Sequence, residues 1–161
     1  MTLVKFTDDE MKQIHRLAAI RHHSAGVAVP PKFSKLDAYG IDLLGAMGEA
    51  AVSMYFEWAV STMLFTNIDD GKDFKTDIGT VQVKTANDPR QKTFYQQKPS
   101  FKADYGIFAR RLDETTIELV GWFYKETWDK FHINLSDNGK SSYGLSADYM
   151  NKHMDELTEE D

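Results

Sequence analysis

The sequence predicts a single α/β domain in which helices come first and a strand-rich part follows. Apolar residues recur at helical spacing over residues 7–22 and over about residues 41–60. From residue 73 onward they alternate with polar residues or form short runs bounded by turn residues, as strands do. With 161 residues and 42% apolar side chains, the chain is suited to one domain with its own core.

The first predicted element is an amphipathic helix over residues 7–22. Thr7 precedes Glu10 by three positions, which is the spacing of a capping box at a helix start. Pro30-Pro31 and Gly40 then predict a loop over residues 24–40, because proline and glycine are the strongest breakers of regular structure.

The second predicted helix spans about residues 41–60 and carries a conspicuous glutamate. At about 100° per residue, Glu49 lies about 20° from Phe56, at the margin of the apolar side, and leans toward the protein. Small residues surround it and allow the close approach of a sheet or a ligand. These small neighbours favour a functional role for Glu49, and a glutamate at the edge of an ordinary apolar stripe is the alternative.

Residues 73–85 predict a β-hairpin with a turn at Asp77-Ile78-Gly79. Strand side chains alternate between faces, so Gln82 and Lys84 project from one face and the neighbouring valines from the other. On the preceding strand Asp73 and Asp77 share a parity, so a carboxylate can come beside the amide oxygen and the ammonium. The hairpin therefore predicts a site for a hard cation with a lysine next to it.

The remaining segments alternate between turns, strands and a polar connector. Residues 61–68 read as a strand or a helix exit, residues 69–71 as a turn, residues 103–109 and 115–123 as buried strands, and residues 146–157 as a short helix. The connector, residues 87–102, is basic and contains interleaved aromatic residues. Such a segment can bind the phosphates of a nucleic acid and stack on its bases. Its candidate nucleic-acid-binding residues are Arg90, Lys92, Tyr95, Lys98 and Lys102. A solvated connector is the alternative.

Charge is distributed unevenly along the chain. The formal net charge is −6, but residues 155–161 hold five acidic residues and no base, so the other residues sum to −1. Residues 72–102 hold seven basic residues and three acidic ones. We therefore expect a folded domain over residues 1–154, an acidic disordered tail over residues 155–161, and positive charge around the hairpin.

Composition excludes several classes of site. The chain has no cysteine, so disulfides, thiolate metal ligands and cysteine nucleophiles are excluded. Residues 1–10 have no apolar core of a signal peptide, and no run approaches the roughly 20 apolar residues that span a bilayer. We expect a cytoplasmic protein without a membrane partner, whose metal ion, if it has one, is held by oxygen atoms.

The ordered set of motifs resembles the PD-(D/E)XK nuclease superfamily. Gly48-Glu49 on a helix is followed by Asp77 and by Gln82-Val-Lys84 on the hairpin. Asp104-Tyr-Gly-Ile-Phe-Ala and Gly121-Trp-Phe then resemble small single-domain members carried by phages and bacteria. The resemblance covers roughly residues 41–124. It implies a restriction-endonuclease-like αβββαβ core with a mixed central sheet, here with an extra N-terminal helix.

The resemblance also implies an activity and a set of site residues. It implies Mg²⁺-dependent cleavage of phosphodiester bonds, with Mn²⁺ as a substitute, at Glu49, Asp77, Gln82 and Lys84. Asp77 and Gln82 would bind the ion, and Glu49 would position a second ion or a bound water. Lys84 would orient the attacking water or offset charge on the reacting phosphate. Asp73, placed opposite Lys84 by a two-residue turn, stays open as the ligand in place of Asp77.

Other functions stay open at this stage. One is a non-cleaving module on the same fold that binds nucleic acid or protein, and another is an interaction protein that works through its acidic tail. The sequence favours DNA as the nucleic acid without deciding between DNA and RNA, or between internal and terminal cleavage. A homodimer would supply the two active sites that a double-strand break needs, and the sequence assigns no interface for it.

Overall fold

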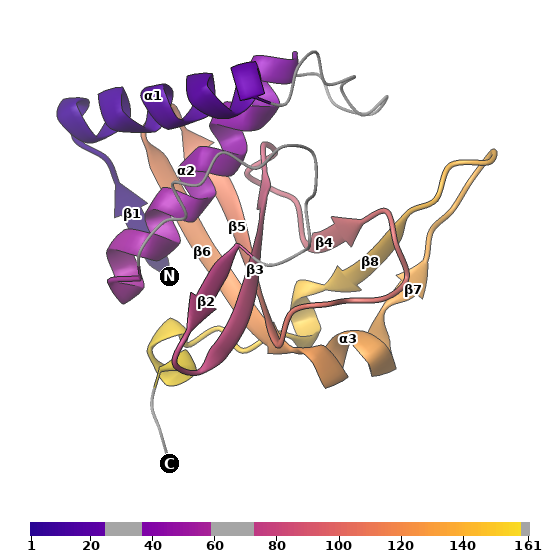
Figure 1. The fold of residues 1–161 in the computed structure, drawn as a ribbon. Coiled ribbons are helices and arrows are strands. Elements are labelled where there is room, and N and C mark those ends of the chain that lie inside the picture. Colours follow the sequence, from indigo (N-terminus) through magenta and orange to yellow (C-terminus); the bar gives the residue numbers. More distant parts are fainter. Residues whose placement is uncertain (25–36, 59–72, 159–161) are drawn as a thin grey trace.

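The chain forms an α/β domain built on a mixed five-stranded sheet (Figure 1). The computed structural model describes residues 1–24, 37–58 and 73–158. The strand order is β1-β6-β5-β3-β2, and only β3 and β5 run parallel to each other. The strands of this sheet are β1 (Thr2–Lys5), β2 (Phe74–Thr76), β3 (Gly79–Ala86), β5 (Tyr105–Asp113) and β6 (Thr116–Tyr124).

Two long helices cover one face of this sheet. Helix α2 (Ala38–Phe56) packs against β3, β5 and β6, and α1 (Asp8–Ser24) packs against α2 (Figure 1). The core between the helices and the sheet includes Met47 and Val52 of α2 together with Val81 and Val83 of β3. This layer fixes which face of β3 is buried under the helices.

The opposite face of the sheet is partly covered by a second, smaller sheet. Its strands are β4 (Thr93–Gln96), β8 (Tyr143–Ser146) and β7 (Ile133–Asn134), in that order, and the short helix α3 (Lys125–Phe131) lies beside it (Figure 1). A second core of aromatic and aliphatic side chains joins the two sheets; its largest members are Phe94, Phe101, Phe108, Phe123, Trp128 and Leu145.

Helix α1 begins with the predicted capping box. The Glu10 N–H donates to Thr7 Oγ1 over 3.2 Å, and the Thr7 N–H donates to Glu10 Oε1 over 2.8 Å. These two bonds satisfy amide groups that the first helical turn leaves without partners. The predicted helix is confirmed and continues to Ser24.

Helix α2 begins earlier than its sequence pattern suggests. The Asp37 carboxylate accepts the Gly40 N–H over 2.7 Å, so Asp37 is the N-cap and Gly40 lies within the first turn. Glu57 follows the helix with a φ of 59°, a left-handed conformation that ends it. The helix therefore ends four residues before the end predicted at residue 60, which itself lies outside the described residues.

The strand predictions need completion at two places. Strand β1 was not anticipated, and it pairs with β6 at the edge of the main sheet. The polar connector contains β4, which leaves the main sheet because Phe94 is buried against the second core. The predictions for residues 61–68 and 69–71 fall outside the described residues.

The series of elements is longer than the predicted αβββαβ core. From α2 onward the described chain runs α2, β2, β3, β4, β5, β6, α3, β7 and β8. The mixed central sheet and the additional N-terminal helix are present. The restriction-endonuclease-like arrangement itself stays a prediction, since β3 is followed by an excursion into the small sheet and then by the parallel strand β5.

The C-terminal part forms two short 3₁₀ helices instead of one α-helix. They are η1 (Ala147–Tyr149) and η2 (Met154–Leu157). Met154 and Leu157 are buried in the core beneath α2, and the Tyr55 hydroxyl donates to the Asp155 carboxylate. The folded domain therefore extends beyond the predicted boundary at residue 154, while residues 159–161 lie outside the description.

Within residues 1–24, 37–58 and 73–158, no helix combines the length and the apolar run that crossing a bilayer requires.

Helix α2 approaches β3 closely at Gly48. A Cβ built at Gly48 would lie 1.7 Å from Thr85 Oγ1 and 3.0 Å from Thr85 Cβ, whereas one at Gly45 meets no atom of the described chain within 4 Å.

We predict that Gly48→Ala lowers the free energy of unfolding by about 1–3 kcal/mol through overpacking. Gly45→Ala, the matched control, should raise it by about 0.5–1 kcal/mol through helix propensity. Urea denaturation measures both, and equal effects would show that the helix does not approach the strand at Gly48.

Tyr55 provides a pH-dependent test of how η2 is anchored. The hydrogen bond to Asp155, aided by burial, raises the pKa of the Tyr55 hydroxyl from 10.0 to about 12. Because the folded-state pKa is the higher one, the stabilisation is complete below pH 10.0 and is lost as the pH rises to about 12.

We predict that Asp155→Asn lowers this pKa, as ultraviolet titration of phenolate formation will show. In a Tyr55→Phe background the same substitution should leave the titration unchanged, and identical curves for the wild type and Asp155→Asn would contradict the contact.

Candidate functional site

Gln82 and Lys84 lie on the face of β3 that α2 does not cover. Val81 and Val83, which alternate with them, are in the core under the helices. Gln82 and Lys84 instead border a cleft on the side of the second sheet. The structure therefore separates the polar and apolar side chains of β3 as strand geometry predicts.

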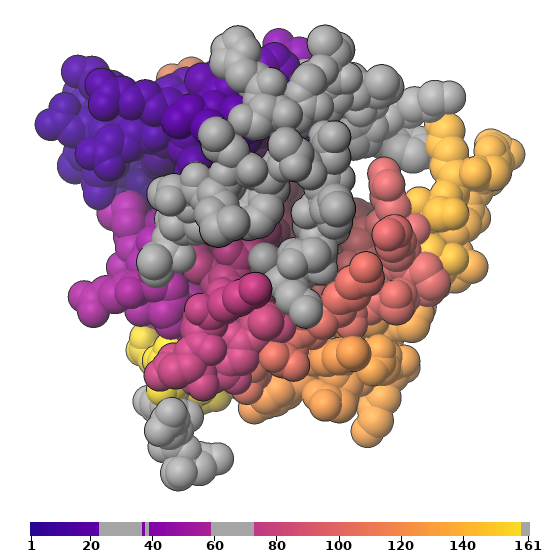
Figure 2. Space-filling model, viewed as in Figure 1, coloured from indigo at the N-terminus to yellow at the C-terminus, as the bar shows by residue number. Residues whose placement is uncertain are grey.

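The cleft that Gln82 and Lys84 border is lined by two other segments of the chain. It has a volume of about 1020 Å³ and is open on one side. Figure 2 shows an opening on this side of the molecule between the segment around β4 (salmon) and the chain of β7 and β8 (yellow). Besides Gln82 and Lys84, the described lining residues are Tyr95, Gln96, Gln97, Lys98, Ser100 and Lys102 on one wall and Leu135, Asp137, Asn138, Lys140, Ser141 and Ser142 on the other.

The wall that bears Lys98 and Lys102 is held by specific hydrogen bonds. Gln96 Nε2 donates to the carbonyl oxygens of Lys98 and Ser100, over 2.7 and 2.9 Å. Trp128 Nε1 donates to the Pro99 carbonyl over 2.8 Å, and Trp128 is itself fully buried. Three consecutive carbonyl groups, those of residues 98–100, thus accept hydrogen bonds from the side chains of Gln96 and Trp128. These bonds hold the backbone from which Lys98 projects.

The opposite wall is a hairpin arm, residues 133–146, which sequence reasoning did not assign to the site. Asn138 and Gly139 have φ angles of 51° and 78° at its tip. Asp137 and Lys140 exchange backbone hydrogen bonds of 2.9 and 3.0 Å across this turn. Asn-Gly is the strongest short hairpin signal in a sequence, so the dipeptide could have predicted the arm.

Asp73 lies beside Gln82. The regular register ends with Phe74 opposite Val81. The Asp73 N–H donates to the Val81 carbonyl oxygen over 2.8 Å, and the Asp73 carboxylate accepts the Val83 N–H over 2.7 Å. Asp73 is therefore bonded to the backbone of β3 on both sides of Gln82 and does not lie opposite Lys84, which corrects the predicted alignment.

Asp77 lies at the other end of the hairpin. It is exposed in the two-residue turn between Thr76 and Gly79, which are paired. At a rise of about 3.3 Å per residue, Gly79 and Lys84 are about 16 Å apart along β3. The structure thus places Asp73 beside Gln82 on the hairpin and leaves Asp77 at the turn.

Glu49 is buried on α2, on the opposite side of the sheet from the cleft. Arg21 of α1 forms an ion pair with it, in which Nη1 donates to Oε2 and Nη2 donates to Oε1 over 3.1 Å. Glu49 is 8% exposed, so it is more enclosed than its predicted place at the margin of an apolar stripe. The pair joins the two helices, and Glu49 is not among the described residues that line the cleft.

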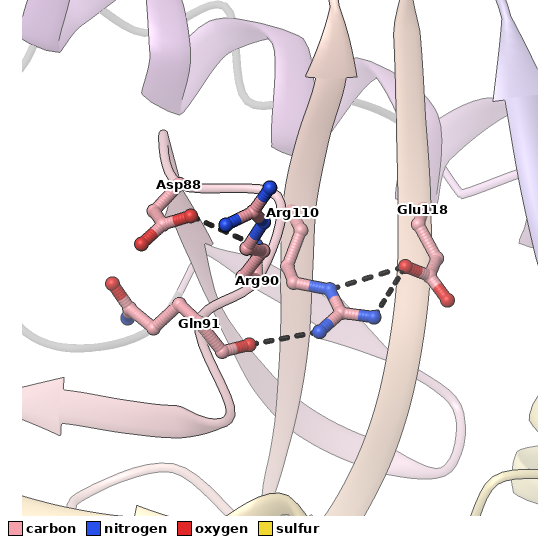
Figure 3. A network of polar contacts seen from close by, with 5 residues as sticks. All are labelled: Asp88, Arg90, Gln91, Arg110 and Glu118. Atoms are coloured by element: carbon pink, nitrogen blue, oxygen red, sulfur yellow. Dashed lines mark hydrogen bonds and ion pairs between the residues drawn. The ribbon is translucent and has the colours of Figure 1, made fainter.

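A polar network holds the start of the connector against the sheet (Figure 3). The Arg110 guanidinium donates twice to Glu118 Oε1, over 3.1 and 2.6 Å, and once to the Gln91 carbonyl over 2.9 Å. Asp88 accepts the backbone N–H of Arg90 over 2.9 Å. This network positions the segment before β4, from which the wall with Tyr95 continues.

The predicted nucleic-acid-binding residues divide into two groups. Tyr95, Lys98 and Lys102 line the cleft. Arg90 and Lys92 are exposed but are not among its described lining residues. The structure adds Lys140, contributed by the arm, to the basic side chains that face the cleft.

The donor set can be compared with what a metal ion requires. The described residues contain no cluster of three or more histidine, aspartate or glutamate side chains suited to one metal ion. Asp73, which is bonded to the backbone on both sides of Gln82, and Gln82 itself supply one carboxylate and one amide oxygen. Mg²⁺ binds through one or two carboxylates and keeps several waters, so this pair meets its minimum requirement.

Resemblance to known proteins was sought in three ways. Comparisons of the chain with models of known protein families, with curated proteins and with solved structures find no match.

Proposed function

We propose that the protein binds nucleic acid, with DNA favoured, in the cleft and hydrolyses its phosphodiester bonds with the help of Mg²⁺. The observation that carries the proposal is the placement of Gln82 and Lys84 at the cleft, with Asp73 bonded to the backbone of β3 on both sides of Gln82. An amide and an ammonium group thus border the cleft, and a carboxylate lies next to them on the same hairpin.

The charges around the cleft support a polyanionic ligand. Lys84, Lys98, Lys102 and Lys140 are among its described lining residues, and Asp137 is the acidic residue among them. The formal net charge of the chain is −6, so this concentration of lysines differs in sign from the molecule as a whole. Phosphates neutralised by lysines release counterions, which is the main source of affinity for nucleic acids.

The roles of the site residues follow from their positions. Asp73 and Gln82 would hold Mg²⁺, or Mn²⁺ in its place, which supplies Lewis-acid polarisation of the phosphate and a more acidic bound water. Lys84, two residues from Gln82 on the same face, orients the attacking water or offsets negative charge that develops on the phosphate. Asp73 is preferred to Asp77 as the carboxylate because it is bonded to the backbone on both sides of Gln82, whereas Asp77 lies in the turn at the other end of the hairpin.

A non-cleaving nucleic-acid-binding protein is the second candidate. The observation that favours it is the ion pair of Glu49 with Arg21, which engages the helix glutamate on the opposite side of the sheet from the cleft. In that case the lysines bind phosphates, and Gln82 contributes a neutral hydrogen-bonding group. Hydrolysis assays with Mg²⁺ and with EDTA separate the two candidates.

Lys84 is the residue whose replacement tests hydrolysis most directly. We predict that Lys84→Ala lowers the cleavage rate by about 100-fold or more, the size of effect expected when a group that acts on the transition state is lost. The affinity of this variant for DNA in EDTA, where no cleavage occurs, should fall only as far as the loss of one lysine–phosphate contact requires. Cleavage of labelled DNA and fluorescence anisotropy measure the two effects.

The matched control for Lys84 is Lys75 on β2. Lys75 is exposed and belongs to the same hairpin. Lys75→Ala should leave the cleavage rate within about twofold, as expected for a surface substitution. A Lys84→Ala variant that cuts at the rate of Lys75→Ala would remove Lys84 from the catalytic set.

The pair Arg21 and Glu49 gives a further prediction. Replacing either residue by glutamine leaves its partner partly buried without its ionic contact, so each variant should lose about 1–3 kcal/mol of unfolding free energy. The double variant should lose less than the sum of the two, because the residues are in direct contact. Thermal and urea denaturation measure this coupling.

Activity separates a structural Glu49 from a catalytic one. If Glu49 serves to hold α1 on α2, Arg21→Gln and Glu49→Gln should alter cleavage to the same small extent at a temperature where both are folded. A loss of cleavage confined to Glu49→Gln would instead return Glu49 to the catalytic set and contradict the structural role.

A further inference from the structure

Tyr95 presents an exposed aromatic surface inside the cleft. It lies on β4, where the preceding residue, Phe94, is fully buried, so the two rings point to opposite faces of the small sheet. Tyr95 is 44% exposed and is among the residues that line the cleft. A tyrosine placed in this way offers a flat apolar face next to lysine side chains.

The position beneath this ring is kept open by Gly144. Tyr95 is paired with Gly144 of β8. A Cβ at Gly144 would lie 2.7 Å from Thr93 Cγ2, 3.1 Å from Leu135 Cδ1 and 3.3 Å from Tyr95 Cδ1. The side chains of Tyr95 and Leu135, which line opposite walls of the cleft, thus both lie close to the space left by the glycine.

Both walls of the cleft carry basic residues. Lys98 and Lys102 come from the connector, and Lys140 comes from the tip of the arm. The backbone around Lys98 is fixed by Gln96, and the backbone around Lys140 by its turn with Asp137. The cleft therefore combines the exposed ring of Tyr95 with cations on two separately built walls.

We infer that the cleft takes a single-stranded polynucleotide, with an unpaired base stacked on Tyr95 and the backbone phosphates between Lys98 and Lys140. In a duplex the faces of the bases are covered by their neighbours, so an aromatic side chain can stack only on a base that is exposed. The arm is then the second wall of the binding site. This inference rests on the nucleic-acid-binding part of the proposed function and does not depend on hydrolysis.

Binding in EDTA tests the inference apart from cleavage. Fluorescence anisotropy with a labelled single strand, the same strand in a duplex, and an RNA of the same sequence gives the affinities at several salt concentrations. The single strand should bind about tenfold more tightly than the duplex. Single-stranded DNA and RNA both offer unpaired bases and phosphates, so their affinities show which of the two is preferred. Tight binding of either strand supports the inference.

Variants at Tyr95 test stacking. Tyr95→Ala should weaken single-strand binding by about tenfold, in line with alanine substitution of stacking residues. Tyr95→Phe keeps the ring and should bind within about twofold of the wild type. Circular dichroism and melting curves check that both variants are folded, and equal affinities of Tyr95→Ala and Tyr95→Phe would overturn the inference.

Variants at Lys140 test the arm, and Lys130 on α3 provides the control. Lys130 is exposed and is not among the described lining residues of the cleft. Lys140→Gln should lower the slope of log affinity against log salt by about 1, whereas Lys130→Gln should leave it unchanged. If the two variants behave alike, the arm is not a wall of the binding site and the inference is wrong.

The outcomes also separate this inference from the proposed function. Duplex binding as tight as single-strand binding, together with Mg²⁺-dependent cleavage, would overturn the inference and leave the proposed nuclease function standing. Tight single-strand binding that depends on Tyr95 and Lys140, without cleavage, would support the inference and reject hydrolysis.

Discussion

The two-sided packing of β3 is the constraint on which the rest of the structure depends. Val81 and Val83 are covered by α2, and the close approach of Gly48 to Thr85 brings the helix down onto the strand. Because strand side chains alternate, burying one face in this way commits the other face to project Gln82 and Lys84. A shift of the strand by one residue would bury these two polar groups under the helix, so the core and the candidate site are specified together.

The second constraint is that both walls of the cleft are built from backbone hydrogen bonds and buried aromatic residues. Gln96 and Trp128 bind carbonyl groups of the turn that carries Lys98, and Arg110 binds the connector further upstream. Binding to a site already held in shape loses less conformational entropy than binding to a mobile loop. The lysines therefore project from a largely prepared backbone, which suits a ligand with regularly spaced negative charges.

Sequence patterns were informative wherever the signal is local. The capping box of Thr7 and Glu10 depends on residues three positions apart, and the division of β3 into two faces depends only on alternation. Where partners are distant, the same reasoning reached its limit. The strand β1 pairs with β6 more than a hundred positions away, and the ion pair of Arg21 with Glu49 joins two helices. A glutamate at the margin of an apolar stripe looks the same whether it faces a ligand or an arginine.

By itself the sequence determined the α/β class, the helix that follows Thr7 and the hairpin. It also determined that Gln82 and Lys84 project from the same face of their strand. These features follow from the spacing of residues within one segment. Tertiary structure decided which aspartate lies beside Gln82, since the two-residue turn sets the register and leaves Asp77 at the tip. It also brought the arm with Lys140 across from Tyr95. The physical reason is that a cleft is formed by segments far apart in the chain, whose meeting depends on how the two sheets pack on their shared aromatic core.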